Sequence, residues 1–297
     1  MSKFYHAAGK RRGYFEGWYC KCVAADGRAL ALIPALHIDE RGRRSASLQL
    51  ITAERSWWLP YPAADFAATE QRFCVQLGDC RFADDGLQLH IDTPQLQLRG
   101  RLFFAPLTRL KRDIMGPFRL LADMECAHGV LSMGHGISGQ LWLNGELWDF
   151  GGGYGYIETD RGHSFPQKYL WTQAHHAGGG LMLAIAAIPR PLRFTGIICA
   201  VTDGGREYRL ASYRGASCLG WDAGGALVRQ GRYLLQAQLL QEQARPLKAP
   251  VGGSMQRIIH ESLCATVEYR LWRGDKLLLH FTDAQAGFEY AANGGRG

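Results

Sequence analysis

The feature that most constrains the fold of this chain is a succession of short apolar segments separated by turn residues, while few stretches show a helical period. Turns are predicted at Asp26-Gly27, Arg41-Gly42 and Asp84-Asp85-Gly86. Short strands at such regular spacing are typical of an antiparallel barrel or sandwich. In the N-terminal part we predict strands at residues 14–23, 29–37, 45–52, 72–77, 87–92 and 96–104.

The rest of the chain continues in the same style. The clearest hairpin spans residues 139–150, where Asn144-Gly145 suits a type I′ turn between alternating apolar residues. Residues 106–118 interrupt the strands and are predicted as a crossover between barrels or a loop over a pocket mouth. Further strands are predicted at 181–188, 194–202, 207–211, 233–241, 265–272 and 276–282, with a loop at 246–253 and a short helix or a strand at 255–263. The chain is therefore predicted to be all-β.

Charge and composition limit the class of protein. The 297 residues carry a net charge of +7 with a pI near 9.0, which suits an anionic partner such as a membrane surface, or simply solubility. Basic clusters lie at residues 41–44 and 109–112. The first fourteen residues lack a signal-peptide core, and the longest apolar run, 181–188, is too short to span a bilayer. We expect a cytoplasmic protein, at most peripheral to a membrane, that binds no nucleic acid and keeps its eight cysteines reduced.

One stretch, residues 149–173, combines glycines, carboxylates and aromatic rings more densely than any other. Gly151 to Gly153 let the backbone turn, and residues 160–162 are predicted to form a second turn. Along an extended strand Glu158 and Asp160 point to one face, because side chains alternate with a period of two. By the same period Tyr169, Trp171 and Gln173 share a face, so the stretch can surround one space with acids, rings and an amide.

This stretch resembles the bacterial branch of the tocopherol cyclase family. The matching residues are Gly155, Tyr156, Ile157, Glu158, Asp160, Gly162, Ser164, Phe165, Pro166, Trp171 and Gln173. Two further blocks are similar to the family: residues 13–19 with Lys21, and a middle block of residues 114–118, 124–126, His128, Ser132, Met133 and His135. Two residues depart from the pattern, since Arg161 stands where the family often has Trp and His175 where it often has Asn.

The resemblance implies a fold of two lipocalin-like antiparallel β-barrels packed together, which the strand pattern alone does not distinguish from one large sandwich. We place the N-terminal barrel at residues 1–108 and the C-terminal barrel, with the block, at 109–297. The implied activity is a cofactor-independent cyclisation of a prenylated quinol or similar apolar substrate. An acid protonates an alkene, and a phenol oxygen captures the cation. No metal is expected, because Cys126, His128, His135, His175 and His176 match no standard zinc spacing.

The predicted site follows from this chemistry. A carboxyl group in an apolar pocket stays protonated more easily, and aromatic faces stabilise a cation by about 0.5–2 kcal/mol each. The predicted catalytic residues are Asp160 or Glu158, supported by Glu16 and His135, and the predicted substrate-binding residues are Tyr14, Trp18, Tyr19, Tyr154, Tyr156, Phe165, Tyr169, Trp171 and Gln173. Arg161 could pair with either acid and would then disfavour its protonated form.

Plainer explanations compete with this one. Glu16 and Glu158 can satisfy buried backbone groups, Asp160 can cap a turn, and the aromatic residues and His135 can be ordinary core. Two other functions also remain open: a lipocalin-like carrier of a hydrophobic ligand without catalysis, or a hydratase of an isoprenoid double bond. An enzyme needs a pocket carboxyl without a salt-bridge partner, whereas the carboxyls of a carrier can all be paired.

Overall fold

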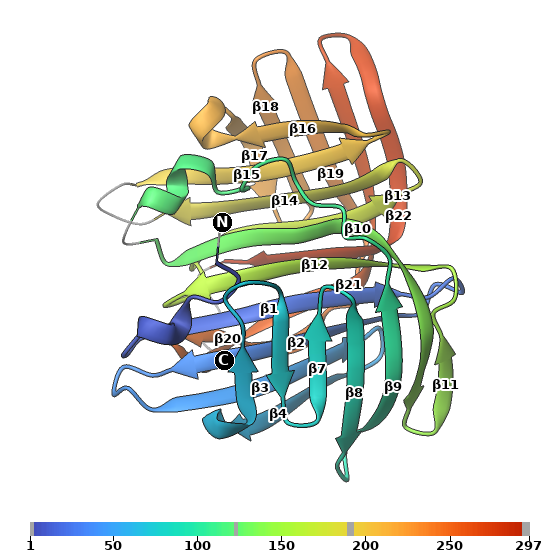
Figure 1. Ribbon diagram of the computed structural model, residues 1–297. Coiled ribbons are helices and arrows are strands. Elements are labelled where there is room, and N and C mark those ends of the chain that lie inside the picture. The colour runs from blue at the N-terminus through green and yellow to red at the C-terminus, as the bar shows by residue number, and fades with distance from the viewer. Residues whose placement is uncertain (1–2, 122–123, 189–192, 293–297) are drawn as a thin grey trace. The chain divides into compact units, whose positions relative to one another are not determined.

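The computed structural model describes residues 3–121, 124–188 and 193–292, and this part of the chain is almost entirely antiparallel β-strand (Figure 1). The helices in these residues are short 3₁₀ turns, the first of them η1 (Ala7–Gly9), and none is long and apolar enough to cross a membrane. The all-β prediction is therefore confirmed.

The strands form two sheets, and the chain divides into two compact units, each of which contains most of one sheet. Unit 1 comprises residues 1–109, 125–165 and 247–258, and unit 2 comprises residues 110–124, 166–246 and 259–297. In spatial order the sheet of unit 1 contains β4 (Ser56–Pro62), β3 (Arg44–Thr52), β2 (Ala29–Ile38), β1 (Tyr14–Val23), β12 (Gly153–Gly162), β10 (Cys126–Leu143), β9 (Gln97–Phe104), β8 (Gly86–Asp92), β7 (Cys80–Ala83), β6 (Cys74–Leu77) and β5 (Phe66–Ala68), while β11 (Glu146–Asp149) pairs with β10.

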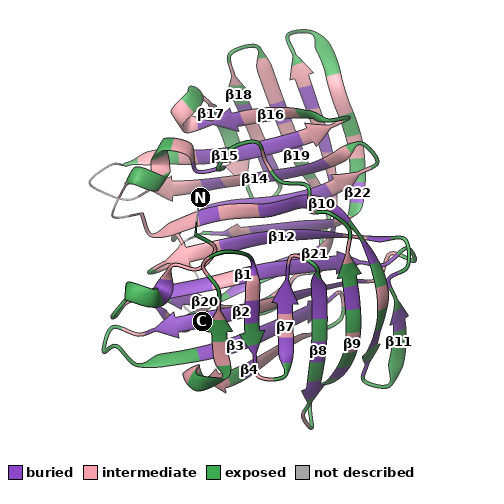
Figure 2. Cartoon of the chain, viewed as in Figure 1, coloured by how far each residue is buried: buried purple, intermediate pink, exposed green. Residues whose placement is uncertain are grey.

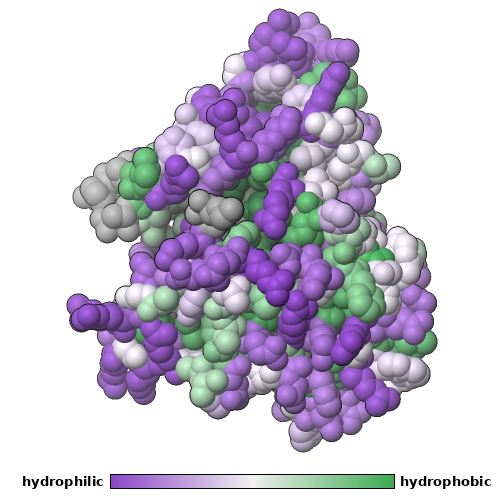
Figure 3. Space-filling view, viewed as in Figure 1, coloured by the Kyte–Doolittle hydropathy of each residue, from purple (hydrophilic) through white to green (hydrophobic). Residues whose placement is uncertain are grey.

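The sheet of unit 1 curls round one apolar core. Its first and last strands, β4 and β5, follow each other in the chain and are joined by η2 (Ala63–Asp65). Trp18, Phe73 and Phe82 are fully buried in the core, together with Ile157 of β12. Figure 2 shows β8 alternating between buried and exposed residues, whereas β1 is buried along nearly its whole length. On the face of the molecule seen in Figure 3, hydrophilic residues predominate and hydrophobic ones gather in smaller patches between them.

The sheet of unit 2 follows the same plan. Its end strands, β16 and β17, are consecutive and joined by η4 (Ser212–Arg214). In spatial order it contains β16 (Arg206–Ala211), β15 (Phe194–Asp203), β14 (Gly179–Ile188), β13 (Tyr169–His176), β22 (Lys276–Ala291), β21 (Ser254–Arg273), β19 (Tyr233–Gln241), β18 (Gly225–Gln230) and β17 (Ser217–Asp222), while β20 (Arg245–Val251) pairs with β21. Two such sheets agree with two barrels rather than one sandwich.

The division of the chain differs from the predicted boundary between residues 108 and 109. Strands β10 and β12 insert between β9 and β1, so residues 125–165 belong to unit 1 with the N-terminal strands. Most of the glycine-, carboxylate- and aromatic-rich stretch therefore lies in unit 1 rather than in the C-terminal unit. Local turn and strand signals do not reveal this pairing, because it joins segments more than one hundred residues apart.

Two local predictions were wrong, and a third had left a helix and a strand open. Residues 160–162 form no turn, because β12 continues to Gly162, where a Cβ atom would lie 2.1 Å from the carbonyl oxygen of Glu125. This glycine allows two strands to approach closely. Residues 246–253 are not a loop but largely strand β20, and the segment 255–263 is wholly strand within β21. Strands β4, β5, β7, β17 and β18 were not predicted.

The predicted hairpin turn supplies a first test. Asn144 and Gly145 have φ angles of 50° and 86°, as a type I′ turn requires. Nothing lies within 4 Å of the position of a Cβ on Gly145, so Gly145→Ala costs only backbone strain. We expect the free energy of unfolding to fall by about 1 kcal/mol. Urea denaturation measures this, with Gly220→Ala as the control, because Gly220 is equally open and lacks a positive φ. An equal effect of both substitutions would contradict the explanation.

Candidate active site

Three side chains lie together on one face of the sheet of unit 1: Glu158 and Asp160, which were predicted to be catalytic, and His128 of the middle block. His128 of β10 lies directly opposite Asp160 of β12. Glu158 precedes Asp160 by two residues and therefore lies on the same face of the strand. The His128 Nδ1 atom lies 2.9 Å from Asp160 Oδ1, and its Nε2 atom lies 3.1 Å from Glu158 Oε2. The first contact is a hydrogen bond, and the second is an ion-pair contact.

Two further side chains extend this group, which we call the His128 cluster: His128, Glu158, Asp160, Tyr156 and Cys126. The Tyr156 hydroxyl donates to Glu158 Oε2 at 2.5 Å, and the Cys126 thiol donates to Asp160 Oδ1 at 3.4 Å. Glu158, His128 and Tyr156 are buried. Both carboxyl groups therefore have polar partners in a place with little water, where hydrogen bonds and charges act strongly.

The geometry places a proton on His128. Burial alone lowers the pKa of this imidazole, but the charges of Glu158 and Asp160 outweigh it, so the pKa of His128 is raised well above its usual value. Burial also raises the pKa of the Tyr156 hydroxyl and of the Cys126 thiol. At neutral pH we therefore expect an imidazolium between two carboxyl groups, with a neutral phenol and a neutral thiol beside them.

The two carboxyl groups differ in accessibility. The side chain of Glu158 is 5% exposed, whereas that of Asp160 is 23% exposed. Every hydrogen bond to Asp160 ends on Oδ1, and in the part of the chain that the structure describes Oδ2 has no partner. Asp160 Oδ2 is therefore the cluster atom best placed to exchange a proton with a bound molecule.

The cluster also offers ligand types for a metal ion. One donor atom from each of His128, Glu158 and Asp160 can be chosen so that all lie within 4.8 Å of one another. However, the two carboxylates face different nitrogens of the imidazole ring, so an ion on either nitrogen would displace one of these contacts. The donor set fits a shared proton better than one shared ion, and the absence of a metal from the reaction stays a prediction.

Glu16 does not join this cluster. In the pairing of β1 with β12, Glu16 lies opposite Arg161 and Tyr19 lies opposite Glu158, so Glu16 occupies the other face of the sheet. Its carboxylate is fully buried and accepts hydrogen bonds from the His6 backbone N–H and the Tyr14 hydroxyl, with the His6 ring at 2.8 Å. Glu16 and Tyr14 thus form a separate polar group.

His135 is also on the face opposite to Glu158. It pairs with Gly155, and a Cβ at Gly155 would lie 2.5 Å from His135 Nε2. The ring packs edge-on to Phe104 at 4.4 Å between centroids, and its Nδ1 lies 2.9 Å from Ser132 Oγ. The Ser132 hydroxyl can donate to the Gly134 carbonyl at 3.2 Å, and in this arrangement Nδ1 carries the proton. Burial lowers the pKa of His135 to about 4.

The predicted aromatic lining is divided between faces and units. Trp18 belongs to the core of unit 1, stacked with Phe66 and Phe73, so the prediction that it lines the site with Glu158 does not fit. Tyr19, Tyr154 and Tyr156 lie on the face of the His128 cluster. Phe165 packs edge-on to Phe15, which is on that face too, at 5.5 Å between centroids.

The other predicted lining residues belong to unit 2. Tyr169, Trp171 and Gln173 share one face of β13, as their spacing predicted, while Leu170 and Ala174 face the core. The Tyr169 hydroxyl donates to the Glu289 carboxylate, and the buried Gln173 Oε1 has no hydrogen-bond partner among the described residues.

The two departures from the family pattern have separate explanations. Arg161 points to the face of Glu16, and among the described residues it forms no ion pair with Asp160 or Glu158. Arg161 therefore does not pair with either acid, and it does not disfavour the protonated form of the acid in that way. His175 donates its backbone N–H to Asp283 within unit 2, and burial lowers its pKa.

His128 is the site residue that the prediction missed, since it was considered only as a metal ligand. A signal existed, because His128 is one of the residues of the middle block. Lys21 was likewise not proposed, although it is buried and lies opposite Tyr156, on the face of the cluster. Buried ionisable groups that gather on one face in this way are typical of functional sites.

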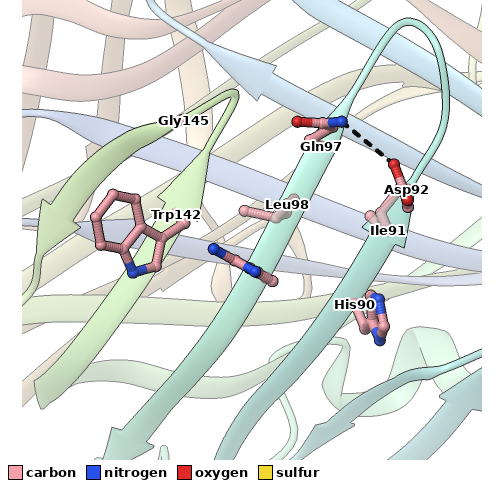
Figure 4. Close-up of a pocket in the computed structure, with 8 residues that line it drawn as sticks. His90, Ile91, Asp92, Gln97, Leu98, Trp142 and Gly145 are labelled. Atoms are coloured by element: carbon pink, nitrogen blue, oxygen red, sulfur yellow. Dashed lines mark hydrogen bonds between the residues drawn. The ribbon is translucent and has the colours of Figure 1, made fainter.

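A shallow groove of about 230 Å³ lies elsewhere on unit 1, over β8, β9 and β10 (Figure 4). Its lining includes His90, Arg99 and the partly exposed Trp142, with a hydrogen bond of 3.4 Å from Gln97 to Asp92. No predicted site residue lines this groove.

The two histidines predict opposite behaviour in solution. At pH 7 we expect His128 to be an imidazolium and His135 to be neutral with its proton on Nδ1, because carboxylates hold the first charged while burial keeps the second uncharged. Long-range ¹H–¹⁵N correlation spectra of imidazole-labelled protein distinguish these states, with the exposed His90 as a reference. A neutral His128 at pH 7 would contradict the proposed charge of the cluster.

Comparisons with known proteins support the fold. No protein-family model matches the sequence, and a search of curated proteins found no match. Among solved structures the chain is similar to a protein provisionally named AttH from Nitrosomonas europaea, with a TM-score of 0.55 and 15% identity over 93% of this chain and 91% of that one. It is also similar to kievitone hydratase from Nectria haematococca, with a TM-score of 0.53 and 9% identity over 95% and 90% of the two chains. At these identities the likeness shows the lipocalin-like fold alone.

Proposed function

We propose that this protein protonates an alkene in the apolar tail of a prenylated substrate and directs the cation to a nearby oxygen, as a tocopherol cyclase-like enzyme would. The observation that supports this most is the state of Asp160. One carboxyl oxygen is held by His128 and Cys126, the other has no partner among the described residues, and the side chain is partly exposed. Tyr19, Tyr154 and Tyr156 supply aromatic rings on the same face.

The proposed cycle conserves every proton. The cycle begins when Asp160 takes up a proton from solvent on Oδ2; it transfers this proton to the less substituted alkene carbon, and a tertiary carbocation forms. The His128 imidazolium stabilises the new carboxylate through Oδ1, while the cluster gains negative charge that attracts the cation. A phenol oxygen of the substrate forms the C–O bond, and its proton returns to Asp160. The product is therefore an isomer of the substrate.

The same acid could serve a hydratase. If water rather than the phenol captured the cation, the product would be a tertiary alcohol. One structural neighbour bears the name of a hydratase, which makes water the first alternative nucleophile to test. Exclusion of water from the site would favour the cyclisation.

A carrier without catalysis is the second candidate, and one observation favours it. Each candidate carboxyl group has a partner, since Glu158 and Asp160 contact His128 and Glu16 contacts His6. Paired carboxyls are what a carrier permits. In each of these three contacts the partner is a histidine, however, and a histidine can pass a proton at neutral pH.

Isotopic labelling separates the three functions. We would incubate the purified protein with 2-methyl-6-phytylquinol under anaerobic, metal-free conditions, in D₂O and separately in H₂¹⁸O, and analyse products by mass spectrometry. Cyclisation adds one deuterium at the protonated carbon and no ¹⁸O, whereas hydration adds both isotopes. Binding of the quinol without product would support the carrier, and neither binding nor product would contradict the proposed substrate class.

A further inference from the structure

A cluster of exposed arginines lies on unit 2, at residues that the proposed reaction does not use. It is built on η3 (Gly116–Leu120), η4 and the start of β15, which Phe118 holds together. The Phe118 ring lies 5.6 Å from the Phe194 ring and 5.3 Å from the Tyr213 ring, between centroids. Figure 1 shows η3 and η4 as short green and gold coils.

Each ring of this aromatic trio has an arginine as a chain neighbour. Arg119, Arg193 and Arg214 are all exposed, and they form no ion pair within the described part of the chain. Leu120, next to Arg119, is 77% exposed, more than any other large hydrophobic residue described. We call Arg119, Leu120, Arg193 and Arg214 the arginine patch.

Two acidic side chains of the neighbouring segments are already engaged. Asp113 accepts the backbone N–H of Met115, while Glu207 pairs with Arg209 at 2.7 Å and accepts the backbone N–H of Lys111. The patch is also fixed in place, because the Tyr213 hydroxyl donates to the Ile114 carbonyl and Gly116 lies against the Tyr213 ring. Three exposed arginines therefore flank one packed group of rings, and an exposed apolar side chain lies next to one of them.

We propose that the arginine patch docks this protein on an anionic phospholipid bilayer. Guanidinium groups bind phosphate strongly, and each basic residue near an anionic membrane adds a similar increment of attraction. An exposed leucine gains free energy by entering the lipid interface. Binding of nucleic acid fits less well, because the aromatic rings that could stack on bases are occupied by one another. This inference does not depend on the proposed reaction.

Vesicle co-sedimentation of the full chain tests the proposal. We would compare phosphatidylcholine vesicles with vesicles of equimolar phosphatidylcholine and phosphatidylglycerol, at low and physiological ionic strength. We expect binding to the anionic vesicles only, weakened by salt. Together Arg119→Gln, Arg193→Gln and Arg214→Gln should weaken binding by about 100-fold, and Leu120→Ser alone by several-fold.

The control removes the same charge elsewhere: Arg99→Gln, Arg101→Gln and Arg229→Gln change exposed strand residues outside the patch. This variant should bind almost as well as the wild type, and unchanged circular dichroism would verify both folds. An equal loss in both triple variants would overturn the proposal, because net charge alone would then explain the binding. So would failure to bind anionic vesicles, full competition by soluble glycerol phosphate, or tighter binding to duplex DNA that the patch variant loses.

Discussion

We expect Asp160→Asn to reduce formation of a cyclised or hydrated product by about 10³-fold, the usual effect of removing a general acid. An amide cannot deliver the proton, although it fills the same space and can still accept a hydrogen bond from His128. Single-turnover measurements with the labelled quinol would give the rate. Quinol binding, followed by fluorescence, should change little, because the substitution removes a proton rather than a contact surface.

Two further variants show which carboxyl is the acid. Glu158→Gln should lower the rate less, by about 10- to 100-fold, because Glu158 positions His128, which it contacts through Oε2. Asp149→Asn is the matched control, since Asp149 is an exposed carboxylate that caps the backbone N–H of Gly151. Equal rates for Asp160→Asn and wild type would exclude Asp160 as the acid, and complete loss in Glu158→Gln alone would transfer that role to Glu158.

The largest effect on stability should come from His128→Leu. This substitution removes a buried cation from between two carboxyl groups and leaves their charge without it. Removing one partner of a buried ion pair costs about 3–5 kcal/mol, and the partial exposure of Asp160 places the expected loss near the lower limit, at about 3 kcal/mol. Urea denaturation at pH 7 measures the free energy of unfolding, with His90→Leu as the exposed control. A loss no larger than that of the control would show that the imidazolium contributes little to stability.

The pH dependence of this difference has a definite sign. The pKa of His128 is higher in the folded than in the unfolded protein, so the stabilisation is fully present below about pH 6.5, the unfolded value. It is lost as the pH rises through the folded pKa, where the imidazolium gives up its proton. The gap in unfolding free energy between wild type and His128→Leu should therefore narrow in alkaline solution. A gap that widened with pH would contradict a raised pKa.

The sequence predicted much of the fold because most strands in this chain carry their own local signals. Alternation of apolar residues and turn dipeptides located β1, β2, β3 and β19 to within a residue or so of their ends. The insertion of β10 and β12 beside β1 could not be predicted in this way. That arrangement depends on pairing between distant segments, and the predicted boundary after residue 108 consequently differs from the observed units.

The candidate site could likewise be predicted within one strand but not between strands. Spacing along one strand placed Glu158 and Asp160 on a common face, and the structure agrees. Whether Glu16 lies on this face depends on the register between β1 and β12. A shift of one residue would have placed Glu16 on the face of Glu158 and Asp160. The composition of β1 gives no guidance, because both of its faces are buried. The roles of these residues in catalysis stay predictions.

Unit 1 is built from segments that are distant in the sequence, and this has a consequence for biosynthesis. When the ribosome has made only the first 109 residues, β1 and β9 are two open sheet edges, because their partners β12 and β10 have not yet been translated. Open edges recruit other strands, including those of neighbouring nascent chains. The sheet of unit 1 is complete only once Gly162 has emerged, so the contact order of this protein is high and its folding correspondingly slow. Synthesis therefore includes a long interval in which the half-made chain depends on protection from aggregation.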